Sequence, residues 1–318
     1  MKLTLSLILL ALPAITFAKG RIVYEMAEAI IKIAKAGKKV KVTELSRNLE
    51  RIPASSHNLV KSLAKRNPEF VSVICRSDTA LNYTIKNPND FNSFLHAWKS
   101  TGGGQYVLRM FNGLKSGGYQ RAIDDLVPKL NKAEIDTLTR SLEGKTYSSE
   151  KLKSIVDKTD CWSSNTTLRG DFFEFLGEKI LSSRPPQGLN LKKGAKIIDG
   201  KFSGTAGIDR IGLDANGRPV IIELTIGNKN PMKRPPPYGP QMSPDWVSHC
   251  WNELVAKQPN KIDELIKSGM SPKYKKAFRP SDFEGDSLFV RKFVVPQGGK
   301  VSNIQGLGLS NINDRIEL

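Results

Sequence analysis

Cysteine is scarce in this chain of 318 residues, which contains three. Cys75, Cys161 and Cys250 are an odd set with no spacing typical of metal ligands. At most one internal disulfide can form, which argues against a disulfide framework and against a thiolate zinc site. Three buried or incidental thiols are the simplest interpretation.

Histidine is equally scarce, and His57, His96 and His249 are isolated from one another. No Cys–His pair for nucleophilic catalysis can be recognised. Each histidine is interpreted as structural or surface-exposed, although His249 follows an acidic hairpin described below closely enough to line the same cleft. The sequence also has no Walker phosphate loop, no dinucleotide-binding fingerprint and no internal repeat.

Long apolar runs are absent beyond the N-terminus, so no later segment is predicted to span a membrane. The first residues have Lys2, an apolar run from Leu3 to Leu12, and a small-residue end at Ala18. These are the three parts of a secretory signal peptide, with cleavage expected after Ala18. The run is short for a membrane anchor, which is the alternative. We therefore expect a secreted or periplasmic protein without stable membrane insertion after signal removal.

Acidic residues are outnumbered, with 31 Asp and Glu against 49 Lys and Arg, a formal net charge of +18. Local basic clusters lie at residues 38–41, 233–237 and 273–276. Such an excess favours DNA or RNA as a partner, through phosphate contacts and counterion release. An anionic membrane surface or an acidic protein would also be attracted. The charge alone does not indicate a nucleic-acid enzyme.

A hairpin is predicted from Ile208 to Leu224, with strands at 208–213 and 219–224 around an Asn-Gly turn. Asp209 and Glu223 lie on these strands near the end opposite the turn, so antiparallel pairing would bring them together. Paired carboxylates on a rigid sheet are suitable ligands for a divalent metal such as Mg²⁺. Two solvent-facing acids on an edge hairpin are the alternative interpretation.

The segments on either side of the hairpin add further features. Residues 169–181 have the apolar spacing of a mostly buried helix. Glu174 interrupts its apolar run, which is costly unless the carboxylate is paired or metal-bound, and Glu178 lies one turn further on. After the hairpin come a basic, Pro-rich loop and a helix opened by Ser243 and Pro244.

The motifs RGDFFE, GIDRIGLDANGRPVIIEL and GPQMSPDWV, in this order, resemble the PD-(D/E)xK nuclease superfamily. The similarity is greatest to the C-terminal nuclease toxin domains of contact-dependent growth inhibition proteins, and it covers about residues 165–260. It implies a restriction-endonuclease-like α/β fold, a mixed sheet flanked by helices. It also implies that Asp209 is the principal Mg²⁺ or Mn²⁺ ligand, that Glu223 is the second, and that Glu174 holds or orients the ion. An exported toxin or effector of this kind implies a cognate immunity protein.

The chain departs from the family pattern at Thr225, where the resemblance leads us to expect a lysine. Thr225 can hydrogen-bond a water molecule but carries no charge. Lys229, Lys233 or Arg234 on the following loop could supply one, and Lys233 and Arg234 are also candidate nucleic-acid contacts. Two interpretations stay open: a Mg²⁺-dependent endonuclease, and a non-catalytic pseudo-nuclease that binds nucleic acid or a protein partner.

The region from 19 to 90 is predicted to form a winged-helix-like domain. Three helices are followed by FVSVIC and LNYTI, which are interpreted as a hairpin around RSDT. The recognition helix would run from Ser55 to Arg66 and would expose Lys61 and Lys65 to nucleic acid. A small helical unit that mediates protein contacts is the alternative.

The rest of the chain completes the predicted organisation. Residues 91–160 have helical spacing interrupted by glycines and are interpreted as a helical linker region. Residues 161–318 form the nuclease-like domain, whose Gly- and Asn-rich tail from Gly298 is expected to add a last strand or to be loosely ordered. The sequence thus predicts an α/β domain preceded by a helical one.

Overall fold

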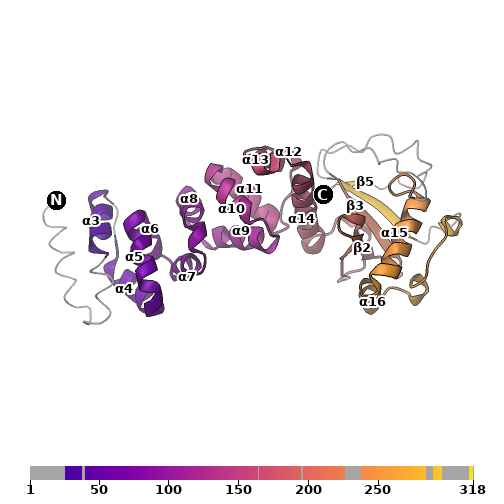
Figure 1. Ribbon diagram of the computed structural model, residues 1–318, viewed down its shortest axis with the longest axis horizontal. Coiled ribbons are helices and arrows are strands. Elements are labelled where there is room, and N and C mark those ends of the chain that lie inside the picture. Colours follow the sequence, from indigo (N-terminus) through magenta and orange to yellow (C-terminus); the bar gives the residue numbers. More distant parts are fainter. Residues whose placement is uncertain are drawn as a thin grey trace. The chain divides into compact units, whose positions relative to one another are not determined.

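A computed structural model of the chain describes residues 26–37, 40–163, 165–194, 196–225, 238–283, 289–295 and 315–317 (Figure 1). It is mixed α/β and mostly helical, which confirms the coarse fold class. The chain divides into two compact units, residues 1–135 and 136–318. The finer division after residues 18, 90 and 160 stays a prediction, and the proposed signal peptide lies outside the described residues.

The first unit consists of short helices in its described part. Its core is aromatic: the ring of Tyr83 stacks on Phe94 at 5.0 Å between centroids and meets Phe111 edge-on at 5.7 Å. The buried Asp90 carboxylate accepts a hydrogen bond of 2.6 Å from the Tyr83 hydroxyl. The helices are α3 (Ala27–Lys35), α4 (Val42–Glu50), α5 (His57–Arg66), α6 (Glu69–Ile74), α7 (Asp78–Lys86), α8 (Phe91–Thr101), α9 (Gln105–Ser116) and α10 (Gln120–Asp125), and α11 (Lys132–Leu142) begins in this unit.

The predicted wing is wrong. The segments interpreted as its two strands form α6 and α7, and Ser77 caps α7 by accepting a hydrogen bond of 3.1 Å from the amide of Ala80. The buried positions 70, 71, 73 and 74 have helical spacing, so tertiary packing outweighs the strand propensity of Val and Ile. Among its described residues the first unit contains no strand. A winged-helix fold is therefore not confirmed.

In its described part, the second unit contains a mixed sheet of five strands in the order β1-β2-β3-β4-β5. Strands β1 to β3 are antiparallel neighbours, whereas β4 pairs with β3 and with β5 in parallel. The strands are β1 (Ile198–Ser203), β2 (Ala206–Leu213), β3 (Pro219–Leu224), β4 (Val290–Val295) and β5 (Arg315–Glu317). The helices are α12 (Ser149–Val156), α13 (Asp160–Ser163), α14 (Thr166–Ser183), α15 (Pro244–Lys257) and α16 (Pro259–Lys267).

The predicted hairpin is confirmed as β2 and β3, with Leu213 opposite Pro219. Its turn is fixed by the Asp214 carboxylate, which accepts hydrogen bonds of 2.9 and 2.8 Å from the amides of Asn216 and Arg218. Gly217 has a φ of +70°, a conformation that glycine adopts without strain. The turn chemistry is therefore local, which explains why the sequence reveals it.

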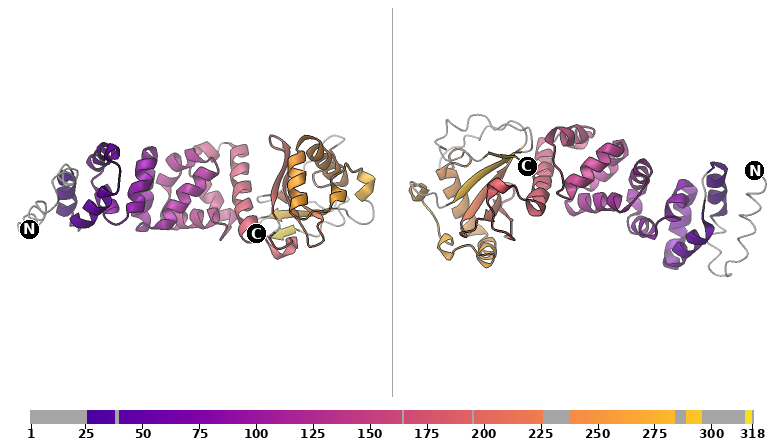
Figure 2. Two further views of the ribbon diagram at one scale, coloured as in Figure 1. Left: turned by 90° about the horizontal axis from the view of Figure 1, so that it is seen from below. Right: turned by 180° about the vertical axis from the view of Figure 1, so that it is seen from behind.

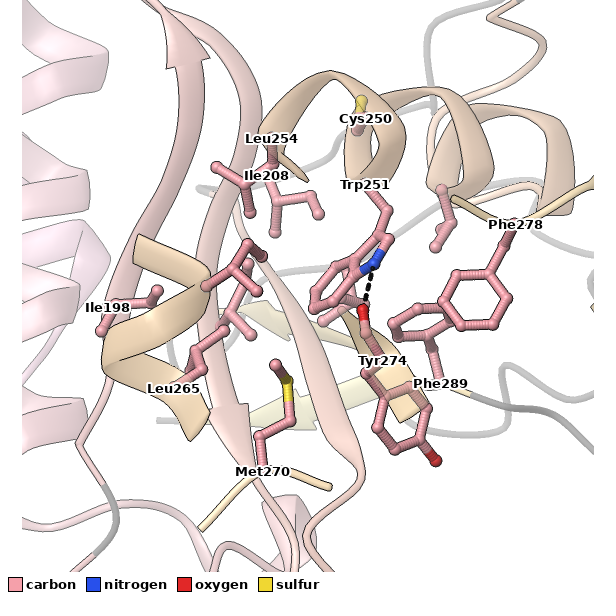
Figure 3. Close-up of a cluster of buried hydrophobic side chains, with 14 of the residues drawn as sticks. Ile198, Ile208, Cys250, Trp251, Leu254, Leu265, Met270, Tyr274, Phe278 and Phe289 are labelled. Carbon is pink, nitrogen blue, oxygen red and sulfur yellow. Dashed lines mark hydrogen bonds between the residues drawn. The ribbon is translucent and has the colours of Figure 1, made fainter. Parts of the chain in front are cut away.

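Helices cover both faces of this sheet (Figure 2). On one face, α15 and α16 pack on the sheet through a core around Trp251, whose indole N–H donates to the carbonyl of Tyr274 at 3.1 Å (Figure 3). On the other face, α14 approaches so closely that a Cβ on Gly177 would lie 3.2 Å from Leu224. The hairpin is thus buried between two helical layers, which fixes its side chains.

Among the described residues, every helix is too short or too polar to be a candidate membrane span.

Candidate active site

Asp209 and Glu223 lie side by side at the ends of β2 and β3 opposite the turn. The amide of Asp209 donates a hydrogen bond of 3.1 Å to Glu223 Oε1, and the amide of Leu224 donates one of 3.0 Å to Asp209 Oδ2. Only 7% of Asp209 and 1% of Glu223 is exposed. The two acids are therefore neighbours held by backbone donors, as the hairpin predicts, and they do not face bulk solvent.

A β-bulge accompanies Asp209. Ile198 of β1 pairs with Ile211, but Gly200 pairs with Ile208, so Asp209 and Arg210 together oppose a single residue of β1. Bulges twist a strand locally and redirect its side chains, and they are frequent beside active sites. Here the bulge coincides with the acid that the resemblance implies as the principal metal ligand.

Gln241 contacts Glu223, the second acid of the pair. Its side-chain amide donates to Glu223 Oε2 from the segment that leads into α15, whose first turn is capped by Ser243. Among the described residues, Gln241 Oε1 and Thr225 Oγ1 are buried and have no hydrogen-bond partner. Unpaired buried oxygens are costly and are common at functional sites, where a ligand or water completes them. Carboxylate, amide and hydroxyl oxygens are also the donor types that Mg²⁺ accepts.

Lys201 is the functional candidate that sequence reasoning missed. From β1, its ammonium donates a hydrogen bond of 2.6 Å to Glu174 Oε2 and lies 3.9 Å from Asp209 Oδ1. Its side chain is 16% exposed. Burial lowers the pKa of Lys201, but the hydrogen bond and charge of Glu174 and the charge of Asp209 outweigh it, so the pKa lies above the ordinary 10.5. A permanent positive charge therefore lies beside Asp209.

A weak signal for this strand is present in the sequence. Ile198, Gly200 and Phe202 alternate with polar residues, and Gly204 provides a turn before β2. Alternation over so few residues predicts a strand only weakly, and it says nothing of the pairing between Lys201 and Glu174.

Glu174 lies on α14 as predicted, but its carboxylate binds Lys201. Within the described residues, no group of three or more His, Cys, Asp and Glu side chains is arranged to hold a metal ion. The expected set of three carboxylates around one ion is therefore not found in the part of the chain that the structure describes. The pair of Asp209 and Glu223 remains, and Glu174 is placed to orient the lysine.

A second set of charged residues connects β1 and β2 to the neighbouring helices. Arg210 bonds Glu178 of α14 at 2.5 Å. Lys261 of α16 donates to Asp199 at 3.0 Å and to the carbonyl of Lys201 at 2.7 Å. These contacts tie β1 and β2 to helices on both faces, so the backbone that carries the candidate residues is fixed.

The remaining predicted residues belong to three different parts of the chain. Thr225 follows β3, and its amide donates to the carbonyl of Val294 at 2.9 Å. Lys61 and Lys65 are on α5 in the first unit, where they line a cavity of about 250 Å³. The predicted charge donors and phosphate contacts of the basic loop, Lys229, Lys233 and Arg234, lie outside the described residues, and their roles stay predictions.

Comparisons of the chain with models of protein families, with curated proteins and with solved structures find no match. The resemblance to the nuclease superfamily therefore depends on the motifs in the sequence, and the functional argument depends on the geometry of this site.

Proposed function

We propose that the chain is a metal-dependent nuclease that hydrolyses phosphodiester bonds of DNA or RNA. The main support is the pairing of Asp209 with Glu223, each carboxylate anchored by a backbone amide and neither exposed to bulk water. Lys201 adds a cation 3.9 Å from Asp209. Two acids and one cation at fixed strand positions suit a reaction at a phosphate group.

The residues fit a magnesium or manganese ion, which would be held by Asp209 and Glu223. Mg²⁺ is commonly bound through one or two carboxylates, with water and substrate oxygens as its other ligands, so the two acids found among the described residues are sufficient for binding. The unpaired oxygens of Gln241 and Thr225 belong to the same kind of donor set. When bound, such an ion polarises a phosphoryl oxygen and lowers the pKa of its water.

The protein residues around the pair have distinct roles in this proposal. Lys201 offsets the negative charge that develops on the phosphate, which is the main form of catalysis that fixed charges provide. Glu174 orients the Lys201 ammonium through the hydrogen bond of 2.6 Å. Gln241 orients the Glu223 carboxylate, and the Thr225 hydroxyl is available to hold a water molecule.

The surrounding charge suits the same substrate. With a net charge of +18, the chain attracts the nucleic-acid backbone. Lys61, Lys65, Lys233 and Arg234 are the proposed phosphate contacts. Export by the N-terminal segment, action as a toxin or effector and a cognate immunity protein are part of the same proposal, and the sequence motifs support them.

Purified protein incubated with DNA or RNA tests the reaction. We expect cleavage with Mg²⁺ or Mn²⁺ and none with EDTA. Asp209→Asn and Glu223→Gln should abolish it, whereas Asp263→Asn, a matched change of an exposed acid, should not. Cleavage that persists in EDTA, or in both site variants, would contradict the proposed site.

A nucleic-acid- or protein-binding pseudo-nuclease is the second candidate function. It is favoured by Thr225 at the position of the expected lysine and by the engagement of Glu174 with Lys201. Tight binding of nucleic acid without cleavage under any of these metal conditions would support the pseudo-nuclease function.

A further inference from the structure

Three aromatic side chains form a row in the second unit, which we call the aromatic row: Phe202, His249 and Tyr238. The ring of His249 on α15 meets Tyr238 edge-on, 4.1 Å between centroids, and meets Phe202 edge-on at 6.0 Å. Tyr238 is 36% exposed and is the one large apolar side chain exposed among the described residues. Phe202 and His249 are half-buried. The row therefore consists of two half-buried rings and one exposed ring.

Both ends of the aromatic row are close along the chain to residues of the candidate active site. Phe202 directly follows Lys201 on β1. Tyr238 comes three residues before Gln241, whose side chain holds Glu223. Neighbouring residues of a strand face opposite sides of the sheet, so Phe202 packs on the α15 side while Lys201 meets Glu174 of α14. Because β1 is an edge strand of the described sheet, one nucleic-acid strand that passes over this edge can meet both the aromatic row and the candidate site.

The electrostatics of the row suit a nucleotide. Burial lowers the pKa of His249 below the ordinary 6.5, more than the neighbouring Glu253 carboxylate raises it, which favours the uncharged ring. The Lys257 ammonium lies 5.5 Å from the centre of the Phe202 ring. Aromatic rings next to an ammonium group suit the flat base and the charged backbone of one nucleotide.

We propose that the aromatic row stacks unpaired nucleobases, so that the substrate of the site is single-stranded DNA or RNA, or an unpaired segment of a folded one. The inference rests on the proposed nuclease function. Bases in a duplex stack on each other and leave no ring face for a protein side chain, whereas an unpaired base offers its face to an aromatic residue regardless of sequence. Lys201 and the acid pair would then act on the adjoining phosphodiester.

Binding in EDTA separates recognition from cleavage. Fluorescence anisotropy measures the binding of short fluorescein-labelled probes. The probes are a single strand and a duplex, each made as DNA and as RNA, and a backbone without bases. We expect the single strands to bind more tightly than the duplexes and than the base-free backbone. The ratio between DNA and RNA single strands identifies the preferred sugar.

Tyr238→Leu removes the exposed ring and should weaken single-strand binding about tenfold, with little effect on the duplex. Tyr238→Phe keeps the ring and should bind like the wild type. Tyr106→Leu, a half-buried tyrosine of α9 in the first unit, is the control for loss of an aromatic residue elsewhere. Phe202→Leu provides a second test of the row, with circular dichroism as the check on folding, because Phe202 also packs against the core.

Equal affinity of wild type and Tyr238→Leu for the single strand, or equal affinity of the wild type for single strand and duplex, would overturn the inference. Cleavage with Mg²⁺ is scored separately. If the wild type cuts nucleic acid and Tyr238→Leu binds and cuts equally well, the proposed nuclease function is supported and the stacking role of the aromatic row is contradicted. A wild type that binds single strands through Tyr238 but never cuts loses the nuclease function, while the aromatic row is supported.

Discussion

Asp209 and Glu223 accept hydrogen bonds from each other's strands: the amide of Asp209 donates to Glu223, and the amide that follows Glu223 donates to Asp209. This exchange holds two buried carboxylates in place with protein groups alone. Charge-assisted bonds from backbone amides are stronger than neutral ones, and they lessen the repulsion between the acids. The pair is therefore preorganised, and its removal has structural consequences as well as functional ones.

Asp209→Ala should destabilise the second unit, because it leaves the buried amide of Leu224 without its acceptor. We expect a loss of roughly 1–3 kcal/mol in the free energy of unfolding. Asp209→Asn keeps an acceptor oxygen and should cost less while still abolishing cleavage. Urea unfolding of both variants measures the difference. Equal stability of Asp209→Ala and wild type would show that the amide finds water instead.

Lys201→Met should reduce cleavage about a hundredfold, the typical effect of removing one fixed group that stabilises transition-state charge. Lys201→Arg keeps a charge and should retain part of the activity, whereas Lys275→Met, an exposed lysine of the same unit, should have no effect. Initial rates at saturating Mg²⁺ measure the change. Full activity of Lys201→Met would transfer the role to the basic loop that carries Lys229 and Lys233.

The raised pKa of Lys201 sets the direction of its pH dependence. A lysine whose folded-state pKa exceeds its unfolded value contributes stability that is complete below about 10.5 and is lost as pH rises through the folded value. Titration of Lys201 should therefore not alter the rate between pH 7 and 9. A fall in wild-type activity in that range that is absent in Lys201→Arg would contradict this assignment.

Thr225→Val replaces a buried hydroxyl that has no hydrogen-bond partner among the described residues with a methyl group of similar size. The free energy of unfolding should stay within about 1 kcal/mol of wild type or rise, because an unsatisfied polar group is removed. Cleavage should fall if the hydroxyl holds a water at the site. Paired measurements of stability and rate distinguish the roles, and unchanged cleavage would place Thr225 outside the mechanism.

Cys75 should make the first unit sensitive to alkali. Burial raises the pKa of its thiol from 9.0 to about 11. Because the folded state favours the protonated thiol, this contribution to stability is complete below pH 9 and is lost as pH rises to 11, at most about 2–3 kcal/mol. Cys75→Ala should lose correspondingly less stability between pH 8 and 11 in urea titrations. An identical loss in both proteins would assign the effect to other groups.

The parts of the site that the sequence predicted are local. The Asn-Gly turn sets the register of β2 and β3, and that register brings Asp209 to Glu223. Lys201 was missed because its partner Glu174 lies 27 residues away, and nothing in either segment specifies the contact. The prediction of the wing is wrong because local composition is misleading there. Residues 70–85 have strand-like composition but a helical pattern of burial.

The parallel pairing of β3 with β4 has a consequence for the order of folding. The hairpin of β2 and β3 closes over a few residues, whereas Val220 meets Val290 only after a loop of about 70 residues has closed. That tenfold longer loop costs about 2 kcal/mol more chain entropy. The strands that carry Asp209 and Glu223 are therefore expected to pair early, and β4 to join a template that already exists. A nascent chain emerging from the ribosome would have its acid pair assembled before the sheet is complete.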